Sequence, residues 1–98
     1  MEAAAPVDRV FDLLMTQKAD GSFVRSTVLE VWLGAPRLAK LEAAIRAHGE
    51  AIATTAVVIA LLEHEARDRE AEWRPAIVKA KAWLGAKGAS VDVIAILR

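Results

Sequence analysis

The residues with the clearest potential for chemistry stand together in the segment His64-Glu65-Ala66-Arg67-Asp68. On a helix, His64 and Asp68 are one turn apart and could share a metal ion, with Glu65 as the base, as in the H-E-x-x-H pattern of metal-dependent hydrolases. A catalytic metal site usually takes three protein ligands. The second histidine, His48, precedes Gly49 and is expected at the end of a different helix. A small metal-dependent hydrolase is therefore the least favoured function.

A purely structural interpretation accounts for the same residues. Glu63 and Arg67 are spaced i,i+4 with the acid first, which is the order that stabilises a helix surface, and Glu65 and Arg69 repeat that spacing. His48 suits a helix C-terminus, where a donor meets unpaired carbonyls. The sequence contains no cysteine and no tyrosine, so few residues could form a nucleophilic catalytic triad. We expect no catalytic residue, no metal and no cofactor.

The elements that position these residues are organised around one apolar stretch, Ile52–Leu62. A helix that is apolar on nearly every side is usually the buried, central one, with amphipathic helices packed around it. We expect a helix from about Glu50 to about Glu70, buried in its first half and solvated in its second. At eleven residues, the stretch is too short to span a bilayer, which takes about 20. The predicted fold class is all-α, a compact bundle of about five helices around a central helix at about 50–70.

One amphipathic segment and a turn come first in the chain. A helix is expected from Pro6 to about Gln17, with one apolar stripe formed by Val7, Val10, Phe11, Leu14 and Met15. Asp20-Gly21 marks a turn, after which Phe23 is expected to return to the core as a plug.

A short helix and a longer one are then expected, each bounded by recognisable signals. The shorter one opens at Ser26 or Thr27, where Thr27 and Glu30 fit a capping box. It ends at Leu33, before Gly34. The longer helix runs over 36–48, with Leu38, Leu41, Ile45 and His48 on one side.

The chain after the central helix contains a proline and a second apolar segment. Pro75 disfavours a helical Arg74, so we predict a break near 70–74 and a fifth helix that runs to about residue 86. Its inward side is formed by Ile77, Ala80 and Leu84. A linker at 85–90 leads to the tail Val91–Leu97, which is either a short helix capped by Ser90 or an extended strand. Folding of the tail back onto the core is the preferred alternative.

Composition limits the classes of partner. The 98 residues form one domain, 1–98, and the 13 basic residues balance the 13 acidic ones. We therefore expect no nucleic-acid partner and no membrane partner, and we interpret Lys79, Lys81 and Lys87 as a solvated face. The N-terminus has no signal-peptide pattern and a helix is expected close to it, which suggests a cytoplasmic domain excised from a larger protein.

Two segments give the chain a resemblance to a known family. One is the turn Gln17-Lys18-Ala19-Asp20-Gly21-Ser22-Phe23, and the other is Trp73 with Lys79-Ala80-Lys81-Ala82-Trp83-Leu84. With a buried alanine-rich helix between them, they resemble the vault-interaction (INT-like) C-terminal region of the vault-associated poly(ADP-ribose) polymerase. Proteins that join a vault inter-α-trypsin domain to a von Willebrand factor A domain have a similar C-terminal region. The resemblance spans about Val7 to Leu84.

The resemblance implies an interaction domain and not an enzyme. In the vault-associated polymerase, the similar region is implicated in binding the major vault protein. The transferase core, the vault inter-α-trypsin domain and the von Willebrand metal site have no counterpart in this sequence. The implied function is a non-catalytic domain that tethers a larger protein, as cargo, to a shell-forming partner that resembles the major vault protein.

The tryptophans suggest where such a partner binds, because tryptophan is common at the energetic centre of interfaces. Trp73 and Trp83 belong to the resemblance and are expected in the core. Trp32 lies on the shortest helix and either fills the core or faces a partner. We predict a partner-binding patch formed by Trp32, Leu33, Ile94, Ile96 and Leu97. The alternative function is a helical self-association module, and the expected state is a monomer or a weak homodimer.

Overall fold

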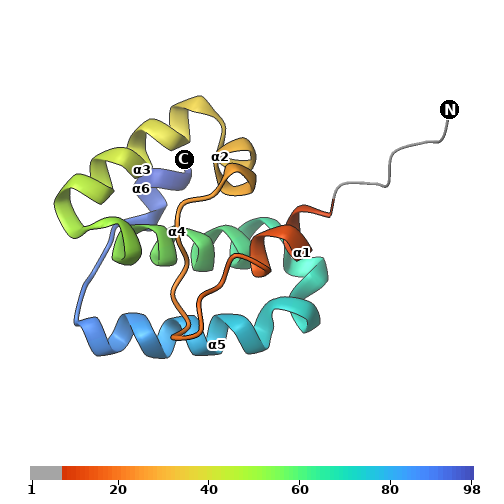
Figure 1. The fold of residues 1–98 in the computed structure, drawn as a ribbon. Helices are drawn as coiled ribbons and strands as arrows, with labels where there is room; N and C mark the ends of the chain where they lie inside the picture. The colour runs from red at the N-terminus through yellow and green to blue at the C-terminus, as the bar shows by residue number, and fades with distance from the viewer. Residues whose placement is uncertain (1–7) are drawn as a thin grey trace, which may run out of the picture.

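The computed structural model describes residues 8–98, and over that range the chain is helical with no strand (Figure 1). The predicted all-α bundle around a central helix is confirmed. The elements are α1 (Arg9–Leu14), α2 (Thr27–Leu33), α3 (Ala35–His48), α4 (Glu50–Glu65), the 3₁₀ turn η1 (Arg67–Arg69), α5 (Glu70–Lys87) and α6 (Val93–Leu97).

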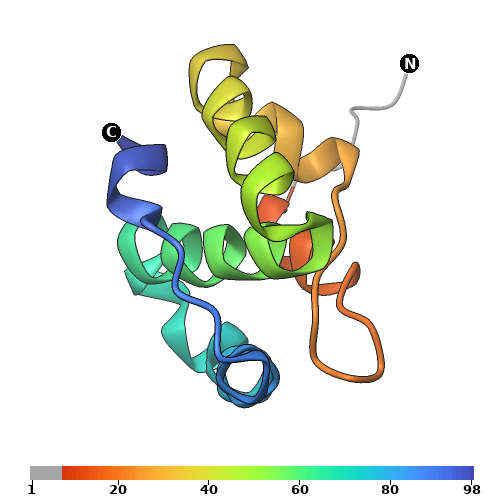
Figure 2. The same ribbon diagram turned by 90° about the vertical axis from the view of Figure 1, so that its left-hand side faces the viewer.

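Helix α4 is the centre of the bundle. Every residue from Ala53 to Leu62 is buried, and α3, α5 and α6 all pack against this helix. Figure 2 shows α3 and α6 on one side of α4 and α5 on the other. The apolar stretch is therefore buried, as its composition predicts, because other elements pack around it. Within the described residues, no helix is both long and apolar enough to cross a membrane.

Two glycines separate α2, α3 and α4. Gly34 has φ +79° and Gly49 has φ +93°, a region that other residues rarely adopt, so each glycine ends one helix and starts the next. The start of α2 differs from the predicted capping box. Ser26 is the N-cap, and its side chain accepts a hydrogen bond from the Leu29 N–H at 3.3 Å. Thr27 is already helical, which leaves Glu30 to pair with a neighbouring arginine instead.

Helix α1 is shorter than predicted, because it ends at Leu14 and the chain turns there. Leu13 is fully buried, while Phe11 and Met15 of the predicted stripe are 56% and 69% exposed. A helix of only six residues packs against its neighbours through one narrow face. The apolar side chains of the predicted stripe that fall outside this face remain exposed to water. Pro6 and Val7, where the helix was expected to begin, lie outside the described residues.

The turn at 17–23 is anchored by the Gln17 side chain. Its Nε2 donates to the Gly21 carbonyl at 3.0 Å and to the Ala76 carbonyl of α5 at 2.8 Å. Gly21 has φ +100°, and a Cβ there would lie 2.8 Å from the Lys79 carbonyl oxygen, so only glycine fits. Packing against α5 thus explains why the turn has glutamine at position 17 and glycine at position 21.

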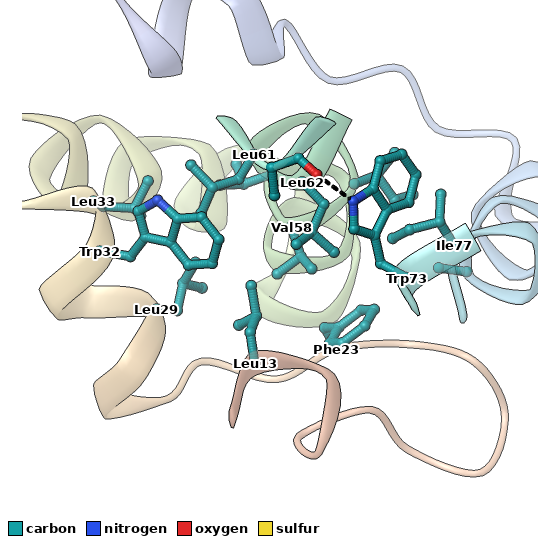
Figure 3. Packing of buried hydrophobic residues seen from close by; sticks show 14 of the residues in the cluster. Leu13, Phe23, Leu29, Trp32, Leu33, Val58, Leu61, Leu62, Trp73 and Ile77 are labelled. Carbon is teal, nitrogen blue, oxygen red and sulfur yellow. Dashed lines mark hydrogen bonds between the residues drawn. The ribbon is translucent and has the colours of Figure 1, made fainter. Parts of the chain in front are cut away.

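Phe23 is the plug that the sequence predicts, with no exposed surface (Figure 3). The turn delivers it to the middle of the core, beside Leu13. Its backbone N–H donates to the Thr55 hydroxyl of α4 at 2.8 Å, so a buried donor is satisfied and the turn is fixed to the central helix.

The break between the fourth and fifth helices lies earlier than predicted, at Ala66 and η1 and not at 70–74. Pro75 lies inside α5. The carbonyl of Ala71, which loses its helical donor, belongs to an exposed residue and can be hydrated. Ala66 instead leaves the helical region, and its carbonyl accepts a 2.8 Å hydrogen bond from the buried Trp73 indole (Figure 3). A tertiary contact therefore sets the break.

The end of the chain folds back as a helix. Helix α5 continues to Lys87, three residues into the predicted linker, and buries Ile77 and Ala80, with Leu84 partly buried against the core. Asp92, and not Ser90, caps α6 by accepting from the Ala95 N–H at 3.2 Å. Of the two alternatives for the tail, the structure shows the helix.

Candidate protein-interaction surface

A cluster of one tryptophan, two arginines and one glutamate joins α1, α2, α3 and α4; we call Arg9, Trp32, Arg37 and Glu65 the Trp32 cluster. The Trp32 indole N–H donates to Glu65 Oε1 at 3.1 Å, and Arg37 Nη1 donates to Glu65 Oε2 at 2.5 Å. The Arg9 guanidinium lies 4.3 Å from the centre of the Trp32 ring, within cation–π range. Arg37 also donates to the carbonyls of Trp32 and Leu33, which locks its orientation.

Opposing effects set the ionisation of Glu65. Partial burial favours the neutral carboxyl and raises the pKa, whereas the hydrogen bonds from Arg37 and Trp32 and the charge of Arg37 favour the carboxylate. The favourable contacts prevail, and the pKa of Glu65 lies below its ordinary value of 4.5. At neutral pH the cluster therefore contains a carboxylate already paired in a fixed geometry.

Three hollows meet at this cluster. The first is a mostly polar cleft of about 430 Å³ that is lined by Trp32, Glu65 and the Asp8–Arg69 ion pair. The second, about 320 Å³ and mostly apolar, lies between α1 and α2, with Val31 and Trp32 in its wall. The third, about 280 Å³, lies where the end of α4 meets α6 and is lined by Glu65, Ile94, Leu97, His64 and Arg98.

The Asp8–Arg69 ion pair closes one side of the polar cleft. Arg69 Nη2 is 2.8 Å from Asp8 Oδ2, and the same aspartate caps α1 by accepting from the Phe11 N–H at 3.0 Å. The hydrogen bond from Arg69 and then that from Phe11 lower the pKa of Asp8 from 3.8. The cleft wall is thus tied to η1 and α1 together.

The predicted partner residues are distributed between the surface and the core. Trp32, Leu33 and Ile96 are 6%, 4% and 5% exposed, so they do not form an open patch with Ile94 and Leu97. Ile94 is 48% exposed and Leu97 is partly buried. Figure 3 shows Trp32 and Leu33 at one end of the core cluster, away from Trp73. Leu33 and Ile96 belong to the buried core. Trp32, Ile94 and Leu97 line the hollows.

The candidate metal segment is arranged differently from the hydrolase pattern. Glu65 is held by Arg37 and Trp32, and α4 ends there, so Asp68 falls on η1 and not one turn further along the same helix. Among residues 8–98, no group of three histidine, aspartate or glutamate side chains is placed to hold a metal ion. The segment instead contributes Glu65 to the Trp32 cluster.

The predicted i,i+4 ion pairs are replaced by pairs between elements. Glu63 pairs with Lys81 of α5 at 2.6 Å. Arg69 pairs with Asp8 and with Glu72. The early end of α4 is the physical reason, because η1 does not keep the helical spacing that the prediction requires.

The remaining candidates have structural contacts. Trp73 is 6% exposed and belongs to the core, as predicted. Trp83 is only partly buried, and Lys87 lies over its ring at 5.2 Å from the ring centre. Lys81 is paired with Glu63, and His48 is exposed at the end of α3. The three lysines are therefore not a uniform free basic face.

Several residues of this surface were not singled out by sequence reasoning. Arg9, Arg37 and Val31 stand out only once α1, α2 and α4 are brought together. Val31 had a usable signal, because it falls between the inward positions Leu29 and Trp32 of a short helix and had to point outward; it is 76% exposed.

The pH dependence of stability tests the Glu65 contacts. Since the folded pKa of Glu65 is lowered, its contribution to the free energy of unfolding is present above pH 4.5 and is lost as the pH falls through the folded pKa. Glu65→Gln should cost about 1 kcal/mol at pH 7, because charged hydrogen bonds at a partly exposed site are partly screened. Urea denaturation from pH 7 to pH 3 should show wild type and variant converging below pH 4.5. A constant difference across this range would contradict the role assigned to the carboxylate.

Comparison of the chain with models of protein families, with curated proteins and with solved structures finds no match.

Proposed function

We propose that this chain is a non-catalytic protein-interaction domain that tethers a larger protein, as cargo, to a shell-forming partner resembling the major vault protein. The observation that carries the proposal is the Trp32 cluster at the junction of three hollows. Tryptophan and arginine are the residues most enriched among interface hot spots. An apolar wall beside a charged rim is the usual composition of an interface.

The cluster also has the rigidity that docking favours. Hydrogen bonds join Trp32 to Glu65 and Arg37 to both Glu65 and the Trp32 carbonyl. A protein that docks here therefore meets side chains that are already held in place. Pre-ordered side chains reduce the conformational entropy lost on binding. Docking of two pre-formed surfaces, with little backbone movement, is the proposed mode.

Exposed apolar side chains border the hollows. Val31 of α2 stands beside the apolar hollow and Ile94 of α6 beside the third, at 76% and 48% exposure. Burying each of them against a partner would contribute about 1–2 kcal/mol. The identity of the partner rests on the family resemblance of the turn at 17–23 and of the segment at 79–84.

Calorimetric titration of the domain against purified major vault protein tests the proposal. We expect saturable heat with one site per shell subunit or fewer. Absence of heat, together with failure to co-sediment with assembled shells, would contradict it and leave self-association as the alternative function.

A further inference from the structure

Helix α5 carries a second apolar face on the side that points away from α4. The inward face is formed by Trp73, Ile77 and Ala80, which are buried. At about 100° per residue, another group of uncharged side chains gathers on the opposite side of the helix, and all of them are exposed: Ala71, Pro75, Val78, Ala82 and Ala86. We call these five residues the outer α5 face. In Figure 1, α5 forms the lower edge of the bundle, and the exposure of these side chains shows that no described element covers them.

Charged residues border the outer α5 face on both sides. Around the helix, one border carries Glu70, Arg74 and Lys81, and the other carries Glu72 and Lys79. Arg74 pairs with Glu70 of its own chain, and among the described residues Lys79 forms no ion pair. The side chains of Glu70, Glu72 and Lys81 are 47%, 52% and 55% exposed, so each can turn towards a second molecule. Each border therefore offers an acid and a base to a partner helix.

We propose that the outer α5 face binds the same face of a second copy of this chain, with the two α5 helices antiparallel. In such a pair, a two-fold axis brings each border against the same border of the second copy. Glu70 and Lys81 are centred on the point between residues 75 and 76, and so are Glu72 and Lys79. A two-fold axis at that point therefore places Glu70 opposite Lys81 of the second copy on one border. On the other border, it places Glu72 opposite Lys79 of the second copy. Both borders select the same register, and this charge complementarity specifies the occupant.

The apolar residues fit together in the same register. Val78 of one copy stands level with position 73 of the other, midway between Ala71 and Pro75 on the outer α5 face. Helices usually pack with the side chains of one entering the spaces between side chains of the other. The short side chain of Ala71 lets the two helices approach closely. Val78, which is 62% exposed in the single chain, would thereby be removed from water.

The expected dimer is weak. The contact is one helix face of about 20 Å by 10 Å, well below the about 1,200 Å² at which standard interfaces begin. The Ala71 carbonyl, which Pro75 leaves without a helical donor, must also keep a water molecule at the contact. We expect a dissociation constant on the order of 100 µM, so the chain is a monomer at the micromolar concentrations of a shell titration. The inference is therefore independent of the proposed shell partner.

Sedimentation equilibrium from about 10 µM to about 1 mM tests the surface. The native chain should pass from monomer to dimer over this range. Val78→Lys should dimerise about tenfold or more weakly, because its ammonium group would be buried at the contact, beside Arg74 of the second copy. The matched control, Val31→Lys, makes the same change at an exposed valine of α2 and should dimerise as the native chain does. A native chain that stays monomeric at about 1 mM, or equal dimerisation of the two variants, would overturn the proposal.

Cysteine crosslinking tests the register, because the chain has no cysteine of its own. In the proposed dimer, the two copies of residue 75 are offset by about 1.5 Å along the helix axis, whereas the two copies of residue 86 are offset by about 30 Å. At about 1 mM chain, a short bismaleimide should therefore join Pro75→Cys chains about tenfold more efficiently than Ala86→Cys chains. Both positions are exposed on the same face, so both thiols are open to the reagent in the single chain. Equal crosslinking at the two positions would contradict the antiparallel register and overturn the proposal.

Discussion

Replacement of Phe23 with alanine should lower the free energy of unfolding by about 3–5 kcal/mol, the range for removal of a fully buried aromatic ring. The ring has no exposed surface and lies between α1 and the central helix. Few side chains can move into the space, because the turn on which Phe23 sits is fixed by Gln17 to α5 and by Thr55 to α4. For a domain of this size, the loss is a large part of the total stability.

Phe11→Ala is the matched control, since it removes the same atoms from a ring that is 56% exposed. It should cost less than about 1 kcal/mol. Urea denaturation followed by tryptophan fluorescence measures both. If Phe23→Ala unfolds the chain, Phe23→Leu should retain the fold with a smaller loss. Equal losses for the two alanine variants would show that Phe23 is not the plug that the packing indicates.

The elements that sequence reasoning located well are those fixed by local chemistry. Gly34 and Gly49 end helices because their backbones adopt a positive φ, and the sequence marks both. The apolar stretch of α4 is buried because no other placement suits a helix without a polar side. Phe23 is a large apolar residue that directly follows a turn, so its burial in the core could be predicted.

The elements that it misplaced are decided by how side chains pack in the folded chain. The break after α4 follows from the hydrogen bond between the Trp73 indole and the Ala66 carbonyl, and Pro75 is tolerated because it stands on an exposed face. Neither the hydrogen bond nor the exposure of Pro75 has a signature in the local sequence.

The predicted patch and the candidate surface share three residues. The prediction selected Trp32, Ile94 and Leu97, and the structure places all three in the walls of adjoining hollows. Leu33 and Ile96 were selected for the same apolar character, which suits a core equally well. Glu65 was considered for metal chemistry, and its actual partners, Trp32 and Arg37, lie 33 and 28 residues earlier in the chain.

The largest expected effect on function is that of a charge introduced at Val31. This side chain is 76% exposed beside the apolar hollow, and glutamate favours a helix more than valine does, so Val31→Glu should leave the fold intact. At a docked interface the carboxylate would be buried without a partner, which should weaken shell binding by about 2 kcal/mol or more, or about 30-fold.

Val78→Glu provides the control on α5. This valine is 62% exposed, so the change in charge and in side-chain size is the same, but it does not line any of the three hollows at the Trp32 cluster. Circular dichroism and urea denaturation should show that both variants are as stable as the native chain to within about 0.5 kcal/mol.

Calorimetric titration of Val31→Glu and Val78→Glu against the same preparation of major vault protein tests the central claim most directly. The proposed docking surface predicts that Val78→Glu binds as the native chain does and that Val31→Glu loses about 30-fold or more in affinity. Equal affinity of the two variants would contradict docking through the surface around the Trp32 cluster.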